Sequence, residues 1–144
     1  MLHLRQRIAR DEGFTLIELL VVLLIISILL SIAIPSYLGF QKKAQQTAAM
    51  SDVRSAIPDA EAYYSDNNYS YTAMTATGLH TTYDLGLIVS SSGSTGIVSA
   101  IPSHTDSQKY CISAVDAGHW AHAAGPGGLV QNDINATSDP CSGF

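Results

Sequence analysis

The sequence predicts an α+β fold, in which one long N-terminal α-helix packs on a small antiparallel β-sheet. Three observations predict it. Residues 14–34 are almost entirely apolar, residues 36–64 repeat apolar side chains at three- and four-residue steps, and the chain beyond residue 85 consists of short apolar runs separated by Gly, Ser and Asp. A helical period that gives way to short runs bounded by turn residues is typical of this fold class.

Residues 14–34 are long and apolar enough to cross a membrane as a helix. At about 1.5 Å per residue the segment is about 30 Å long, which matches the hydrocarbon thickness of a bilayer. Its aliphatic side chains cover the whole circumference of the helix, so it needs lipid or other helices on every side. Glu18 is the one charged residue within it. An acid in such a span is costly and therefore indicates a functional site.

Residues 1–13 form a basic leader that carries Arg5, Arg7 and Arg10. By the positive-inside rule, these arginines place the N-terminus in the cytoplasm and the rest of the chain outside it. The leader has no apolar core of its own, so it differs from a conventional signal peptide, which is cleaved after its apolar part. An uncleaved membrane anchor is the simplest interpretation of these features alone.

The order of these features resembles the type IV pilin and pseudopilin family. The resemblance covers residues 5–64 and is carried by the basic leader, the sequence GFTLIE that begins at Gly13, the aliphatic run and Pro35. It implies that a membrane prepilin peptidase cuts between Gly13 and Phe14 and that the new amine of Phe14 is methylated. It also implies an assembly ATPase and a platform protein as partners.

Cleavage would give Glu18 a partner, because it frees an ammonium group at Phe14 and opposite charges attract strongly in a low-dielectric setting. The two residues are four positions apart and could pair within one chain. The resemblance implies pairing between subunits instead, in which Glu18 of an incoming chain meets the Phe14 amine of its neighbour and sets the axial register. A glutamate that merely extends to the membrane interface is the third alternative.

We expect the helix to continue beyond the span, through residues 36–65, as an amphipathic segment that packs on the sheet. Pro35 lacks an amide hydrogen and should kink or break the helix. Pro58 should kink it or end it one turn early. The apolar face of this half carries Met50, Val53, Ile57, Ala60 and Tyr64.

Residues 66–144 are expected to form a β-rich head domain outside the cytoplasm, after a turn at residues 66–69. Segments 86–90 and 96–101 suggest one hairpin, and segments 109–115 and 119–124 suggest a second. Gly118 in the second turn suits a positive φ angle. Together the segments predict a four-stranded antiparallel sheet, followed by an irregular tail from Gly125.

The stretch 63–71 holds four of the seven tyrosines. Their rings could be exposed at subunit contacts, as the resemblance suggests, or could pack as ordinary half-buried rings.

Cys111 and Cys141 are the only cysteines. An even pair in an exported domain indicates a disulfide, here one that ties the tail to a strand. Two free thiols are the alternative.

Asp133, Asn135 and Asp139 alternate along the tail as oxygen ligands could around calcium, and the resemblance implies calcium binding in this region for some pseudopilins. The segment lacks the Gly and closing Glu of an EF-hand loop, so these three are weak candidates, and we expect no metal or other cofactor. His119 and His122 should lie on opposite faces of a strand and share no metal. Two glycosylation sequons begin at Asn68 and Asn135.

Composition and spacing exclude several classes of function. After the leader the chain has four basic and ten acidic side chains, which argues against nucleic-acid binding by phosphate neutralisation. No spacing orders Ser, His and Asp residues into a catalytic site, so we do not expect an enzyme.

We interpret the chain as a structural subunit of a type IV pilus, a homo-oligomeric helical filament. The precursor would cross the bacterial cytoplasmic membrane once, and the assembled subunit would be extracellular. A pseudopilin of a type II secretion or competence system is the alternative, and a membrane-anchored enzyme or binding domain is a further one. The expected parts are a leader (1–13), a membrane and filament-core helix (14–35), its amphipathic continuation (36–65) and the head (66–144).

Overall fold

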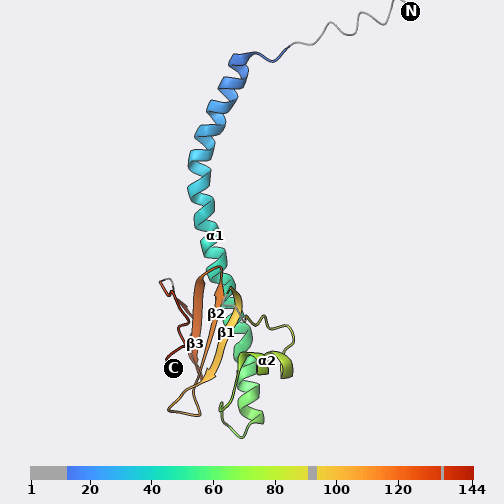
Figure 1. Ribbon diagram of the computed structural model, residues 1–144, viewed down its shortest axis with the longest axis vertical. Coiled ribbons are helices and arrows are strands. Elements are labelled where there is room, and N and C mark those ends of the chain that lie inside the picture. The colour runs from blue at the N-terminus through green and yellow to red at the C-terminus, as the bar shows by residue number, and fades with distance from the viewer. Residues whose placement is uncertain (1–12, 91–93, 134) are drawn as a thin grey trace, which may run out of the picture. The chain divides into compact units, whose positions relative to one another are not determined.

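The computed structural model describes residues 13–90, 94–133 and 135–144 (Figure 1). The leader arginines and the turn of the first expected hairpin therefore lie outside the described residues. The architecture is α+β, as the sequence predicts. The chain divides into two units, Met1–Gly39 and Phe40–Phe144. The elements are α1 (Leu16–Asp66), α2 (Ala76–Thr82), β1 (Thr95–Pro102), β2 (Tyr110–Asp116), β3 (His119–Gly125) and β4 (Gln131–Asp133).

Helix α1 has 51 residues and is continuous through both of its prolines. The expectation that Pro58 ends the helix early is therefore wrong, as is a break at Pro35; a kink at Pro35 stays a prediction. Pro58 is exposed, whereas Ala56 and Ala60 on either side of it are fully buried. Packing on both sides of Pro58 thus holds the backbone in the helix and offsets the lost hydrogen bond.

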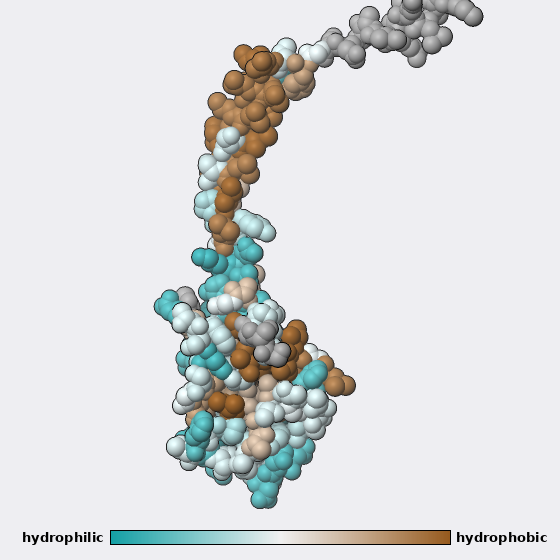
Figure 2. Space-filling view, in the orientation of Figure 1, coloured by the Kyte–Doolittle hydropathy of each residue, from teal (hydrophilic) through white to brown (hydrophobic). Residues whose placement is uncertain are grey.

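In the first unit the aliphatic side chains of α1 are exposed around the whole helix. The face seen in Figure 2 is largely brown, with pale patches between the brown side chains. Among the described residues, α1 is the one helix long and apolar enough to span a membrane. Its hydroxyl groups donate to the helix backbone, from Ser27 to Leu23 O at 2.7 Å and from Ser31 to Ile28 O at 2.7 Å. These bonds leave the hydroxyl hydrogens satisfied in an apolar environment.

In the second unit the C-terminal half of α1 packs on one face of the sheet (Figure 1). Val53 and Ala60 are fully buried there, as expected, and Met50, Ile57 and Tyr64 pack at the margins. Ala49 and Ala56 are also fully buried.

The sheet has the order β1-β2-β3-β4, and every neighbouring pair is antiparallel. Strands β2 and β3 form the second expected hairpin. Its two turn residues, Ala117 and Gly118, have φ angles of 46° and 83°. Two positive φ angles are the requirement of a type I′ turn, so the prediction of a positive φ at Gly118 is confirmed.

The first expected hairpin is wrong, because residues 86–90 form no strand. An Asx turn, in which the Gly86 amide donates to Asp84 Oδ1 at 2.7 Å, directs this segment along β1. Val89 then makes a single parallel bridge to Ile97. Gly96 has φ 105°, and a Cβ atom there would lie 2.5 Å from the Ile88 carbonyl oxygen, so this close approach requires glycine.

Strand β4 replaces the missing strand at the other edge of the sheet. The sequence suggested an irregular tail after Gly125, but Gln131–Asp133 pairs with β3. Helix α2 was also not predicted. Thr75 caps it by accepting the Gly78 amide at 3.0 Å.

Candidate functional site

The first turn of α1 is closed by a reciprocal pair of side chains, Thr15 and Glu18. The Glu18 amide donates to Thr15 Oγ1 at 3.3 Å, and the Thr15 amide donates to Glu18 Oε2 at 2.9 Å. The Thr15 hydroxyl also donates to Oε2, at 2.6 Å. With Thr15 directly before the helix and Glu18 at its third position, this geometry is a capping box. It satisfies amide groups that the helix would otherwise leave without partners.

The capping box uses one of the two carboxylate oxygens of Glu18 and leaves the other available. Both bonds from Thr15 end on Oε2, and Oε1 accepts no hydrogen bond from the described residues. Gly13 and Phe14 precede the helix, and the Phe14 side chain is 75% exposed. The expected cleavage junction is therefore accessible, and Glu18 Oε1 can accept a further donor such as an ammonium group.

The Cys111–Cys141 disulfide is present and closes a 30-residue separation. It joins β2 to the tail on the sheet face opposite α1. Asp139 reinforces the joint, because its carboxylate accepts hydrogen bonds from Ser99, from Ser113 Oγ at 2.6 Å and from the Cys141 amide at 2.9 Å. Ser113 is fully buried. The tail is therefore fixed on the sheet by the disulfide and by the two hydrogen bonds from Ser99 on β1 and Ser113 on β2, while the Cys141 amide bond holds Asp139 within the tail.

The three weak calcium candidates are not brought together as a ligand set. Asp133 Oδ2 lies 2.6 Å from His122 Nδ1, and Asp139 is bound by the serines. Asn135 is exposed. Within residues 13–90, 94–133 and 135–144, no cluster of three His, Cys, Asp or Glu side chains could hold a metal ion. Instead, the Asp133 carboxylate of β4 pairs with His122 on β3, and the Asp139 carboxylate binds the tail to the two serines.

A cluster of tyrosines surrounds Glu61 at the end of α1. Tyr71 and Tyr110 are both 1% exposed, and their hydroxyls donate to Glu61 at 3.0 and 3.2 Å. The ring of Tyr71 lies between those of Tyr64 and Tyr110, with centroid distances of 4.7 and 4.6 Å. Burial first, and the Glu61 carboxylate second, raise the pKa of Tyr71 and Tyr110 above the ordinary value of 10.0.

The tyrosines of the stretch 63–71 differ in burial, and a subunit contact at the exposed ring stays a prediction. Tyr71 is packed in the core, whereas Tyr69 is 67% exposed.

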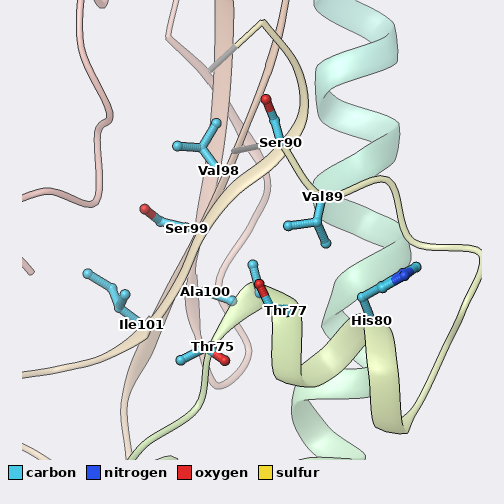
Figure 3. A pocket seen from close by; sticks show the side chains of 10 residues that line it. Thr75, Thr77, His80, Val89, Ser90, Val98, Ser99, Ala100 and Ile101 are labelled. Atoms are coloured by element: carbon cyan, nitrogen blue, oxygen red, sulfur yellow. The ribbon is translucent and has the colours of Figure 1, made fainter. Parts of the chain in front are cut away.

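An open cleft of about 660 Å³ lies between α2 and β1 (Figure 3). Its lining consists of Thr, Ser, Ala, Val and Ile residues and one histidine, His80, whose ring points away from Ser99 and Ile101. The Thr75 hydroxyl is already used to cap α2. No acid–base pair faces the cleft among its lining residues, so we assign it no chemistry.

Sequence reasoning missed several residues of these sites, among them Thr15 and Glu61. Thr15 could have been found, because Thr followed by Glu three positions later before an apolar run is the sequence pattern of a capping box. Glu61 could not, since its role depends on Tyr110, which is distant in the sequence.

The prokaryotic N-terminal methylation motif matches residues 8–34 of the chain. This match contains the leader end, the Gly13–Phe14 junction, the capping box and most of the aliphatic run. Residues 13–34 of this match are the segment whose geometry is described above.

Curated relatives include pilins and a secretion protein. The type IV wide pilus major component of Thermus thermophilus is 35% identical over 130 residues, which cover 88% of this chain and 92% of that protein. The type IV major pilin protein of Myxococcus xanthus is 37% identical over 59 residues, 41% of this chain and 27% of that protein. The type II secretion system core protein G of Aeromonas hydrophila is 41% identical over 59 residues, 41% of each chain.

The matched region thus spans less than half the length of the Myxococcus and Aeromonas relatives but nearly all of the Thermus one. No solved structure matches the chain significantly. Because it covers 88% of the chain, the Thermus match extends beyond the helix into the sheet. On this similarity and on its fold, the chain belongs to the type IV pilin and pseudopilin family.

Proposed function

We propose that the protein is a structural subunit of a type IV pilus and polymerises through the N-terminal half of α1. The observation that carries this proposal is the exposed aliphatic surface of residues 14–40, which ends at a capped turn containing a single acid. A helix that is apolar on every side needs lipid or other helices around it. Both environments are used in turn if the subunit is stored in the membrane and then assembled into a helical bundle.

The proposal includes processing of the precursor by a prepilin peptidase between Gly13 and Phe14, followed by methylation of the Phe14 amine. The exposure of both residues ahead of the helix supports it. Removal of residues 1–13 takes away Arg5, Arg7 and Arg10, whose charges would otherwise oppose transfer of the helix from the membrane into a filament core. An assembly ATPase and a platform protein are the further proposed partners.

Glu18 would set the register between subunits. In the free chain Oε2 is held by Thr15 and Oε1 has no partner among the described residues. The ammonium of a neighbouring Phe14 could bind Oε1 without breaking the capping box. Aliphatic surfaces alone pack without directional preference, so one such charge-assisted contact would define the axial position of each subunit.

A pseudopilin role is the second candidate, supported by the similarity to the Aeromonas secretion protein. That match covers 41% of this chain, whereas the match to the Thermus pilus component covers 88%. We therefore favour the pilus. The proposed parts remain a leader (1–13), a core helix (14–35), its amphipathic continuation (36–65) and an extracytoplasmic head (66–144), and we propose no catalytic activity.

Mass spectrometry of filaments sheared from intact cells tests this function. We expect the protein in the sheared fraction, with an N-terminal peptide that begins at N-methylated Phe14. A Gly13→Leu variant places a bulky side chain at the junction and should retain the leader and remain in the membrane. A wild-type protein found only in the membrane, with residues 1–13 attached, would contradict the proposal and favour an anchored monomer.

A further inference from the structure

The pattern Asp-x-Asn-x-Ser/Thr occurs twice in the chain, at Asp66–Ser70 and at Asp133–Thr137. Each contains the tripeptide Asn-x-Ser/Thr, the acceptor sequence for N-linked glycans in exported proteins. A tripeptide this short also arises by chance. Its structural context therefore decides whether the asparagine can be modified.

The structure separates the four asparagines of the chain into two pairs. Asn67 donates from Nδ2 to the Tyr63 carbonyl at 2.9 Å, and Asn132 is half-buried within β4. Asn68 and Asn135 are exposed, and neither side-chain amide has a hydrogen-bond partner among the described residues. The Asn132 Oδ1 atom also has no partner among the described residues, but it is buried. The two exposed amides without a partner are therefore the two that begin the acceptor tripeptides.

Both free asparagines lie in turns outside the regular elements. Asn68 lies two residues after Asp66, the last residue of α1, and has φ 54°, so it lies in a left-handed turn. Asn135 follows β4 in a turn where the Ala136 amide donates to the Asp133 carbonyl at 3.1 Å. In Figure 1 these turns are the green loop after α1 and the dark red segment after β3. A modifying enzyme could reach such amides without opening the sheet or the core.

We propose that Asn68 and Asn135 are attachment sites for N-linked glycans. The donor would be an oligosaccharide joined through a diphosphate to a membrane lipid. Asn Nδ2 attacks the anomeric carbon, so the N–C bond forms, the C–O bond to the diphosphate breaks, and the lipid diphosphate leaves with the electron pair. The proton from Nδ2 passes to a base of the transferase. This inference rests on the proposed function only in that the head must reach the outer side of the membrane.

The location of the sites suggests what the glycans would do. A glycan at either turn adds bulky, hydrophilic cover to the head without displacing a packed side chain, because both amides are free. Glycosylation at these positions should therefore leave folding unchanged.

The test is peptide mass spectrometry of the full-length protein purified from its native cells. We expect peptides containing Asn68 and Asn135 to carry sugar on the asparagine. Ser70→Ala and Thr137→Ala should each abolish modification at the one affected site, although both asparagines remain. Ser70→Thr and Thr137→Ser keep the acceptor tripeptide and should retain the glycan, and Asn67→Gln and Asn132→Gln should change nothing.

The N-terminal peptide of the same sample separates this inference from the proposed function. Unmodified Asn68 and Asn135 in a protein that begins at N-methylated Phe14 would overturn the glycan sites while supporting a processed pilin. Sugar that persists in Ser70→Ala and Thr137→Ala would also overturn them, because the attachment could not then depend on these tripeptides. Glycosylated asparagines on a chain that retains its leader would support the sites and contradict the pilus function.

Discussion

Glu18 and Thr15 bind one another in both directions at the first turn of α1, with the Thr15 amide on Glu18 Oε2 at 2.9 Å and the Glu18 amide on Thr15 Oγ1 at 3.3 Å. The glutamate thus stabilises its own helix as well as carrying the charge proposed to set the register. These two roles can be separated by substitution, because glutamine also completes a capping box whereas alanine does not.

Glu18→Gln should be inserted and processed normally but should assemble poorly, since it retains the cap and loses the charge. Thr15→Ala should weaken the cap by about 1 kcal/mol and still assemble, since it retains the charge. Glu18→Ala should also be processed and fail to assemble. Immunoblots of sheared and membrane fractions measure all three variants. Abundant filaments from Glu18→Gln would contradict a register set by charge.

Replacing both cysteines should destabilise the head. In the chain-entropy model, a closed loop of 30 residues contributes about 3–4 kcal/mol. Cys111→Ala/Cys141→Ala should lower the free energy of unfolding by about that amount, measured by denaturant unfolding of the full-length protein in detergent. If the double variant unfolds at the same denaturant concentration as the wild type, the disulfide does not stabilise the tail.

Asp139→Ala should be destabilising although the disulfide is intact. It removes the acceptor for Ser99, Ser113 and the Cys141 amide, and Ser113 is fully buried. A lost hydrogen bond to a charged group costs about 1.5–3 kcal/mol. Ser99→Ala removes one of the three donors and should cost less than Asp139→Ala. Equal stability of Asp139→Ala and wild type in denaturant unfolding would show that the tail does not depend on this carboxylate.

Alkaline pH should unfold the head through Tyr71 and Tyr110. Their pKa values are raised above 10.0 in the folded state, so the unfolded state loses these protons first as the pH increases. The contribution of these two tyrosines to the free energy of unfolding is therefore fully present below pH 10.0 and is lost as the pH rises above it. Tyr71→Phe/Tyr110→Phe should flatten this decline, and Tyr69→Phe, at an exposed ring, should leave it unchanged. A decline of equal slope in the double variant would contradict this assignment.

The long helix and the β2–β3 hairpin could be predicted because their signals are local. The aliphatic run, the period through Val53 and Ala60, and the residues Ala117 and Gly118 specify these elements from their own segments. The Cys111–Cys141 pairing was predictable because the chain offers no other cysteine.

The remaining elements could not be predicted because tertiary contacts determine them. Strand β4 has three residues, too few to show a period, and it exists through pairing with β3. The segment 86–90 has strand-like composition, but it lies parallel to β1 and makes one bridge. In the candidate site, Glu18 was recognisable from the sequence as the one acid of the apolar segment. That Thr15 binds its Oε2 atom, while Oε1 has no partner among the described residues, follows only from the geometry.

The most direct test of the central claim is a cryo-EM structure of the sheared filament at side-chain resolution. We predict a core of packed α1 helices in which Glu18 of each subunit contacts the N-methylated amine of a neighbouring Phe14 while Thr15 still caps the same helix. A filament core built from other parts of the chain, or a Glu18 whose carboxylate meets only its own subunit, would contradict the account.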